Sequence, residues 1–239
     1  MFGAWQAGAW SVLALHFQPD LIVGASVGCL NGYAIAAGCT PAEIRALWRR
    51  PQAAGFRQLP ATIRELVGTH QRKTEFAVVL VDALRMREET YTGAQVTWRH
   101  LVASCAVPGM MRPRRIGSKW CIDGGLLNVL PLPAAIVLGA TEILALNVLP
   151  ESPLPALRPF LKVFRAVFRK KVAIPPGVTV TTLVPPRQLG SFGDACFWKA
   201  ANVDRWYAEG VADATAAIEG GLIPPDLLQN ISTPDCLKP

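Results

Sequence analysis

The stretch Leu21–Gly28, which reads LIVGASVG, carries the strongest indication of the fold. Its first three residues are apolar and partly β-branched, which is typical of a buried parallel strand. The residues that follow match the pattern G-x-S-x-G. We expect a helix to begin at Ser26 and to end at Gly38, because glycine suits the position after the last turn of a helix. A serine between a strand and a helix is the setting that a nucleophile elbow requires.

All five residues of this turn are candidate site residues. Gly24 and Gly28 flank the serine, and in a tight turn glycine avoids clashes with neighbouring backbone. Ala25 and Val27 complete the elbow. The hydroxyl of Ser26 would stand at the N-terminus of the helix, where the partial positive charge stabilises developing negative charge on oxygen. The alternative is a purely structural glycine-rich turn, which the pattern alone does not exclude.

The rest of the chain alternates between short apolar runs and segments with helical signals. This alternation predicts an α/β fold with a mostly parallel central sheet. We place one domain at residues 1–223 and a proline-rich tail at 224–239. We expect strands at 76–82, 142–148 and 178–183, and two short strands within 114–122. We expect one helix after the capping signal Thr40-Pro41-Ala42-Glu43, and two more at 97–105 and 204–219.

The composition excludes several classes of protein. Of the 239 residues, 51% are hydrophobic and 17% are charged, which excludes a disordered chain. The net charge is +7, but the segment 151–175 alone holds six basic residues and one acid. Because the rest of the chain is nearly neutral, we do not expect a nucleic-acid partner.

The cysteines and the uncharged stretches bear on the compartment. Six cysteines are scattered without a CxxC pair, so we expect buried reduced thiols and no metal site. Residues 1–19 carry no charge, but they lack the basic start of a signal peptide. The uncharged run 21–42 contains four glycines and Asn31, which favours a strand and a buried helix over a membrane span. We therefore predict a cytoplasmic protein, either soluble or peripherally membrane-associated.

A nucleophilic serine needs a base, and the histidines are badly placed for that role. The ordinary Ser-acid-His triad is strongly disfavoured, because no histidine follows a late acid: the three are His16, His70 and His100. We expect His16 at a helix end or in the core and the other two on the surface. Asp123 is flanked by apolar residues, so burial would raise its pKa towards the range of a useful base. An aspartate that closes a turn is at least as good an interpretation, and Asp82 is a rival acid.

The sequence resembles the patatin-like phospholipase family. The resemblance rests on GASVG at 24–28, DGG at 123–125 and the segment ASCAVPGMMRPRRIGSKWCIDGGLLNVLPL at 103–132. It implies a three-layer α/β/α fold and a Ser-Asp dyad that hydrolyses lipid acyl esters without histidine, metal or organic cofactor. On this resemblance Ser26 is the nucleophile and Asp123 is the acid, followed by Gly124 and Gly125 of the acid motif. Further positions that match the family pattern are Ala103, Ser104, Pro108, Asn128 and Pro131. The segment WYAEGVADATAAIE at 206–219 resembles the closing helix of the family.

The start of the chain departs from the family pattern. Family members begin with a strand and a glycine-rich loop whose backbone N–H groups form the oxyanion hole. Here only Gly3 matches the end of that loop, and Phe2 stands where a basic residue is usual. We therefore expect Met1 to be an internal methionine of a longer protein, with the first strand missing and the activity impaired. Losing one oxyanion donor costs about 2.7–4 kcal/mol of transition-state stabilisation.

The basic segment 157–171 has the pattern of an amphipathic helix. Its apolar residues recur at helical spacing, which fits an interfacial helix on anionic lipid as well as a helix docked on the sheet. Three arginines at 112, 114 and 115 could add to the same surface. The candidate lipid-facing residues are Arg158, Lys162, Arg165, Arg169, Lys170 and Lys171.

Three functions fit these patterns. The first is a lipid acyl ester hydrolase of the phospholipase A or lysophospholipase type, which acts on lipid or phospholipid and contacts an anionic membrane peripherally. The second is a catalytically impaired lipid-binding or regulatory protein, because the oxyanion loop is incomplete. The third is a soluble esterase or thioesterase. The oligomeric state cannot be predicted from the sequence.

Overall fold

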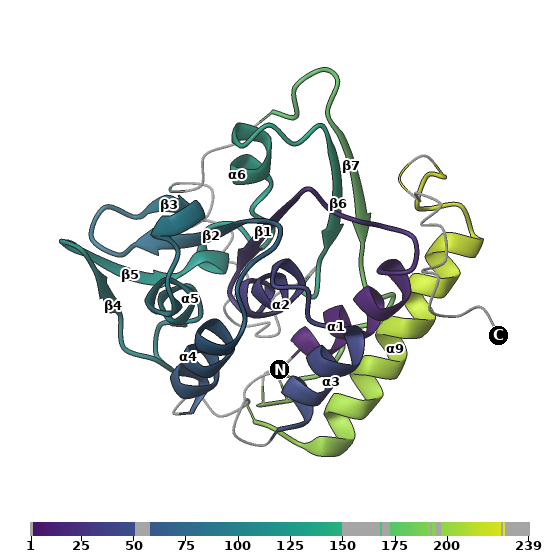
Figure 1. Cartoon of the computed structure of the whole chain (residues 1–239), viewed down its shortest axis with the longest axis horizontal. Helices are drawn as coiled ribbons and strands as arrows, with labels where there is room; N and C mark the ends of the chain where they lie inside the picture. Colours follow the sequence, from purple (N-terminus) through teal and green to yellow (C-terminus); the bar gives the residue numbers. More distant parts are fainter. Residues whose placement is uncertain are drawn as a thin grey trace.

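Strand β2, Glu75–Asp82, lies at the centre of the main sheet (Figure 1). The computed structural model describes residues 2–50, 58–149, 168, 173–191, 193–194, 197–225 and 227. One edge of β2 pairs first with β1 (Leu21–Ala25) in parallel and then with β5 (Lys119–Asp123) in antiparallel orientation. The opposite edge pairs with β3 (Arg87–Thr92), and β4 (Arg114–Ile116) extends the sheet beyond β5.

A second sheet consists of β6 (Glu142–Leu146) and β7 (Thr179–Leu183), which run parallel. The predicted α/β class is confirmed, but the main sheet is mixed rather than mostly parallel. The reason is that the chain reverses twice over short distances, at Met86 between β2 and β3 and at Gly117 between β4 and β5, where φ is positive. Among the described strands, neither β1 nor β6 has a partner on its second edge.

Seven helices of the described ranges surround the sheets. The capping signal at Thr40 is confirmed, since its side chain accepts the Glu43 N–H and the Glu43 carboxylate returns the contact. The final helix begins at Ala200, earlier than predicted. Strand β3 and the helices at Gly3–Leu13, Leu59–Thr69 and Leu132–Val137 were not predicted. The helices are α1 (Gly3–Leu13), α2 (Val27–Ala36), α3 (Pro41–Arg49), α4 (Leu59–Thr69), α5 (Trp98–Ser104), α6 (Leu132–Val137) and α9 (Ala200–Glu219).

The two faces of the main sheet are covered unequally. Phe76, Val78 and Leu80 of β2 point into the large core that α1, α2, α4, α5 and α9 build. Because side chains alternate along a strand, Val81 points to the other face. There it packs with Ile122 and Leu127 in a small cluster beside the 3-10 turn Gly124–Leu126. The described residues thus form a large helical core on one face of the sheet and a small apolar cluster on the other.

The apolar N-terminal stretch forms a core helix. Trp5 of α1 is fully buried, and its Nε1 donates to Asp213 Oδ2 at 2.7 Å. Helix α1 lies along α9 (Figure 1), and the two backbones meet at two glycines. A Cβ on Gly8 would lie 2.0 Å from the Tyr207 carbonyl oxygen, and one on Gly210 would lie 2.1 Å from that of Trp5. Small residues at this crossing are therefore required.

Two further predictions concern the cysteines and the basic segment. The four described cysteines, Cys29, Cys39, Cys105 and Cys121, are buried free thiols as predicted. The segment 157–171, with its candidate lipid-facing residues, lies outside the described residues except for Phe168, which is helical and exposed.

Replacing Gly210 with alanine tests the close approach of α1 and α9. We expect Gly210→Ala to lower the free energy of unfolding by more than about 2 kcal/mol, because the new methyl group meets backbone that cannot move cheaply. Urea unfolding measures the effect. The matched control is Gly68→Ala in α4, where nothing lies within 4 Å of the new Cβ. This control should stabilise the protein by about 0.5–1 kcal/mol, and equal effects of the two changes would contradict the packing account.

Candidate active site

The turn between β1 and α2 holds Ser26 in an unusual backbone conformation. Its φ is 52° and its ψ is −130°, a region that side-chain-bearing residues rarely adopt and that costs of order 1–3 kcal/mol. Gly24 is required here, since a Cβ would lie 2.6 Å from the Cys29 Cα and from the Gly28 carbonyl oxygen. Gly28 is different, because the nearest atom to its Cβ would be Gln6 Nε2 at 3.8 Å. The expectation that both flanking glycines avoid backbone clashes is therefore correct for Gly24 and wrong for Gly28.

The shared edge of β2 brings Asp123 to Ser26. Strand β1 ends where Ala25 pairs with Val79, and the pairing with β5 begins at the next residue, Leu80, opposite Asp123. The ends of β1 and β5 therefore meet. The Ser26 hydroxyl donates a hydrogen bond to Asp123 Oδ2 at 2.6 Å.

The Asp123 carboxyl group is almost completely buried, with 5% of the residue exposed. Burial raises its pKa to about 6 from an ordinary value of 3.8, and the hydrogen bonds from Ser26 and from the Gly125 N–H offset part of the rise. The Gly125 N–H donates to Oδ1 at 2.7 Å. Gly124 packs so closely that a Cβ would lie 2.2 Å from the Val79 carbonyl oxygen. In the acid motif, Gly125 thus binds the carboxylate, and Gly124 allows the turn to pack closely against β2.

A hydrogen-bonded bridge under the elbow was not anticipated from the sequence. Ser104, which ends α5 and is fully buried, accepts the Ser26 N–H at 3.0 Å and donates to the Val79 carbonyl at 2.7 Å. The Cys105 thiol donates to the Ser26 carbonyl at 3.2 Å. The Ala106 carbonyl accepts the Asp123 N–H at 3.1 Å. The end of α5 therefore fixes both the serine and the acid, and the only signal for it was the Ala-Ser-x-x-x-Pro pattern.

The other candidate residues lie elsewhere. Asp82 is buried, but its Oδ1 accepts the N–H groups of Leu84 and Arg85 and closes the turn after β2. His100 was expected on the surface, and this was wrong. Its Nδ1 accepts the Thr97 N–H in a capping interaction, its ring packs 4.5 Å from that of Tyr91, and burial lowers its pKa.

Gly3 lies at the start of α1. Its carbonyl accepts a hydrogen bond from Asn31 Nδ2 at 2.8 Å, and a Cβ there would overlap the Trp48 ring. Asn31 belongs to α2, so these contacts tie α1 to the helix that follows the elbow. An oxyanion role for Gly3 stays a prediction.

An apolar cavity of about 200 Å³ adjoins the elbow. Residues of β1 and β6 line the cavity, together with Gly28 and Trp10. Gln6 spans this region, since its Nε2 donates to the Leu146 carbonyl at the end of β6.

Two possible features are not found in the described part of the chain. No cluster of three or more His, Cys, Asp or Glu side chains there could hold a metal ion. Within the same ranges, no helix combines the length and the apolar composition needed to cross a bilayer.

The fold and the site together define a class of protein. A serine on a strained strand-to-helix turn, hydrogen-bonded to a buried carboxylate in a mixed α/β fold, is an arrangement suited to a serine hydrolase. The family model for patatin-like phospholipase matches residues 1–84 and 92–136, which include both Ser26 and Asp123. The chain belongs to the patatin-like phospholipase family, whose members are lipid acyl hydrolases.

Replacing Ser104 with alanine tests the bridge below the elbow. We expect Ser104→Ala to lower the free energy of unfolding by about 1–3 kcal/mol, because a buried carbonyl and a buried N–H lose their partner. Urea unfolding measures this loss. Ser11→Ala serves as the control, since its hydroxyl binds the Gly8 carbonyl in the same helix and should matter by less than about 0.5 kcal/mol. A loss no larger than in the control would contradict the bridging role.

Proposed function

We propose that the chain hydrolyses acyl esters of lipids, in the manner of a phospholipase A or lysophospholipase, with Ser26 as nucleophile and Asp123 as base. The 2.6 Å hydrogen bond between Ser26 Oγ and Asp123 Oδ2 is the observation that carries the proposal. Family membership supports the lipid acyl ester as the substrate class. If Asp123 is the base, Ser26 needs no neighbouring histidine to act as a nucleophile.

The first half-reaction forms an acyl-serine. Asp123 Oδ2 accepts the proton while Ser26 Oγ attacks the acyl carbonyl carbon. The tetrahedral intermediate carries a negative oxygen, which the first N–H groups of α2 at Val27 and Gly28 can stabilise. The carbon–oxygen bond to the alcohol then breaks, and the alcohol leaves with the proton from Asp123.

The second half-reaction restores the serine. Asp123 takes a proton from a water molecule that attacks the acyl-serine, and the second tetrahedral intermediate collapses to the carboxylic acid. Ser26 recovers its proton from Asp123. Burial supports this role, because a carboxyl group with a pKa of about 6 is both a usable base and a usable acid near neutral pH.

A lipid-binding protein with little turnover is the second candidate function. It is favoured by the departure at Phe2, which stands where the family pattern has a basic residue. Such a protein would bind fatty acid or phospholipid but would release no acid from an ester. A soluble esterase, by contrast, would hydrolyse water-soluble esters at a rate that does not rise when vesicles are added.

Replacing the nucleophile tests the proposal directly. We expect Ser26→Ala to lower kcat for a p-nitrophenyl ester by at least about 10³-fold, since the acyl-serine can no longer form. Asp123→Asn should cause a comparable loss, because the amide cannot accept the proton. Ester turnover and circular dichroism are measured together, with Ser11→Ala as a control that keeps its activity. Full turnover by folded Ser26→Ala would reject the assignment.

The pH profile tests the role of Asp123 as base. Only the ionised carboxylate can accept the serine proton, so kcat/KM should rise with pH and reach half its plateau near pH 6. A profile that stays flat from pH 5 to 7, or that falls as the pH rises, would contradict this role.

A further inference from the structure

The main sheet projects beyond the elbow at one end. Past its pairing with β1, strand β2 continues through Leu80–Asp82 and turns at Leu84 and Arg85. At about 3.3 Å per residue, this turn lies roughly 10–15 Å beyond the level of Ser26. The β4–β5 hairpin pairs beside it and projects in the same direction (Figure 1). Both turns therefore extend from the end of the sheet that carries the site.

The two hairpins and the residues just before β4 expose both basic and large apolar side chains. Five exposed arginines lie there with two large apolar residues, of which Leu84 is 78% exposed and Trp120 is 47% exposed. Trp120 is the direct cross-strand partner of Arg115, and its carbonyl accepts the Ala83 N–H of the neighbouring turn. We call this set the hairpin surface: Leu84, Arg85, Arg87, Arg112, Arg114, Arg115 and Trp120.

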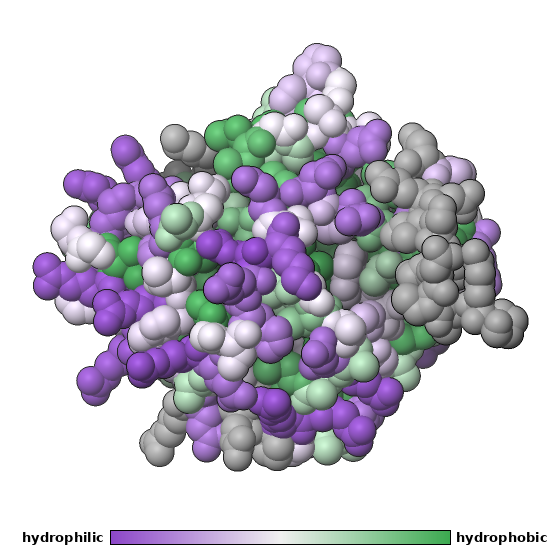
Figure 2. Space-filling view, viewed as in Figure 1, coloured by the Kyte–Doolittle hydropathy of each residue, from purple (hydrophilic) through white to green (hydrophobic). Residues whose placement is uncertain are grey.

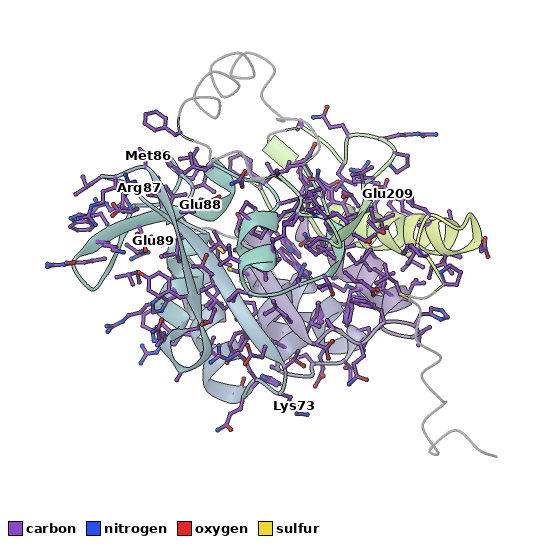
Figure 3. All side chains as sticks on the ribbon, turned by 90° about the horizontal axis from the view of Figure 1, so that it is seen from above. Lys73, Met86, Arg87, Glu88, Glu89 and Glu209 are labelled. Carbon is purple, nitrogen blue, oxygen red and sulfur yellow. The ribbon has the colours of Figure 1, made fainter. Side chains whose placement is uncertain are left out.

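The acidic neighbours of the hairpin surface are withdrawn from it. Asp82 is buried and bound to backbone N–H groups. Glu88 accepts from Asn128 Nδ2, and Glu89 pairs with Lys119 at 2.6 Å. Figure 2 shows hydrophilic side chains over this end of the molecule with hydrophobic ones between them, and Figure 3 shows Met86 and Arg87 at the end opposite Glu209. The hairpin surface is therefore basic, with the apolar side chains of Leu84 and Trp120 exposed among the arginines.

Basic residues around exposed tryptophan and leucine fit an anionic membrane. Arginines near an anionic leaflet are attracted to its surface potential, and tryptophan prefers the boundary between headgroups and acyl chains. A nucleic-acid backbone would use the arginines but would leave Leu84 exposed to water. Charge and apolar exposure together favour lipid.

We propose that the hairpin surface docks on membranes that contain anionic lipid and holds the elbow at the lipid–water interface. The inference rests on the proposed function for the reason to meet lipid, but docking can be measured without turnover. It does not depend on the segment 157–171.

Vesicle co-sedimentation tests the proposal on the full chain with Ser26→Ala, so that no lipid is hydrolysed. Vesicles of phosphatidylcholine alone are compared with an equimolar mixture of phosphatidylcholine and phosphatidylglycerol. We expect binding to the mixture that weakens at high salt, and little binding to phosphatidylcholine alone. Absence of binding to the mixture would overturn the proposal. So would preferential binding of a duplex oligonucleotide.

Charge-matched variants assign the binding to this surface. Arg114→Gln with Arg115→Gln should weaken partitioning about tenfold or more. The control pair, Arg64→Gln with Arg187→Gln, removes the same charge from exposed positions elsewhere and should bind like the parent. Equal loss in both pairs would mean that net charge alone drives binding and would overturn the proposal. If the first pair fails to fold, Arg85→Gln with Arg112→Gln takes its place.

Fluorescence tests contact by Trp120 itself. Brominated lipid in the mixed vesicles should quench the parent protein more than the Trp120→Phe variant, because only the parent places an indole at the interface. Equal quenching would overturn docking through this surface. Vesicle binding with no ester turnover by the unsubstituted chain would reject the proposed function and leave the docking inference standing.

Discussion

One edge of strand β2 is shared by two other strands, and the arrangement of the site depends on that sharing. The parallel pairing with β1 stops at Val79, and the antiparallel pairing with β5 starts at Leu80. Ser26 follows the residue that pairs with Val79, and Asp123 pairs with the next residue of β2, Leu80. This pairing brings the Ser26 hydroxyl to 2.6 Å from the Asp123 carboxylate. A shift of β5 by one residue would turn the carboxyl group to the opposite face. A shift that brought Asp123 into the place of Gly124 would also put a Cβ about 2.2 Å from the Val79 carbonyl oxygen.

The energetic cost of the site is concentrated in two residues. Ser26 adopts a strained backbone conformation, and Asp123 carries a carboxyl group into a buried position. Ser104 and the Cys105 thiol bind the backbone of the serine, while Ser26 and Gly125 bind the carboxyl group. The two hydrogen bonds to the carboxyl group offset its desolvation only in part, since burial still raises the pKa of Asp123 to about 6. The same incomplete compensation leaves the carboxyl group able to exchange a proton near neutral pH.

Local signals predicted much of this structure, and the failures involve contacts between distant segments. The elbow, the capping box at Thr40 and strand β2 each follow from a few neighbouring residues. The antiparallel entry of β5 and the bridge through Ser104 depend on residues far apart in the chain, and no local pattern encodes them. His100 was misplaced because its capping contact with Thr97 and its packing on Tyr91 outweigh the polarity of the ring. Gly28 fits the motif, yet its freedom from clashes shows that a matching glycine need not be a steric requirement.

Labelling with a fluorophosphonate, followed by peptide mapping by mass spectrometry, tests the central claim most directly. The reagent forms a stable phosphorus–oxygen bond with an activated serine and releases fluoride, so no particular lipid has to be identified. We expect one adduct, on Ser26, and labelling that is lost in folded Asp123→Asn. An adduct on another serine, or equally fast labelling of Ser26 without the Asp123 carboxylate, would contradict the central claim.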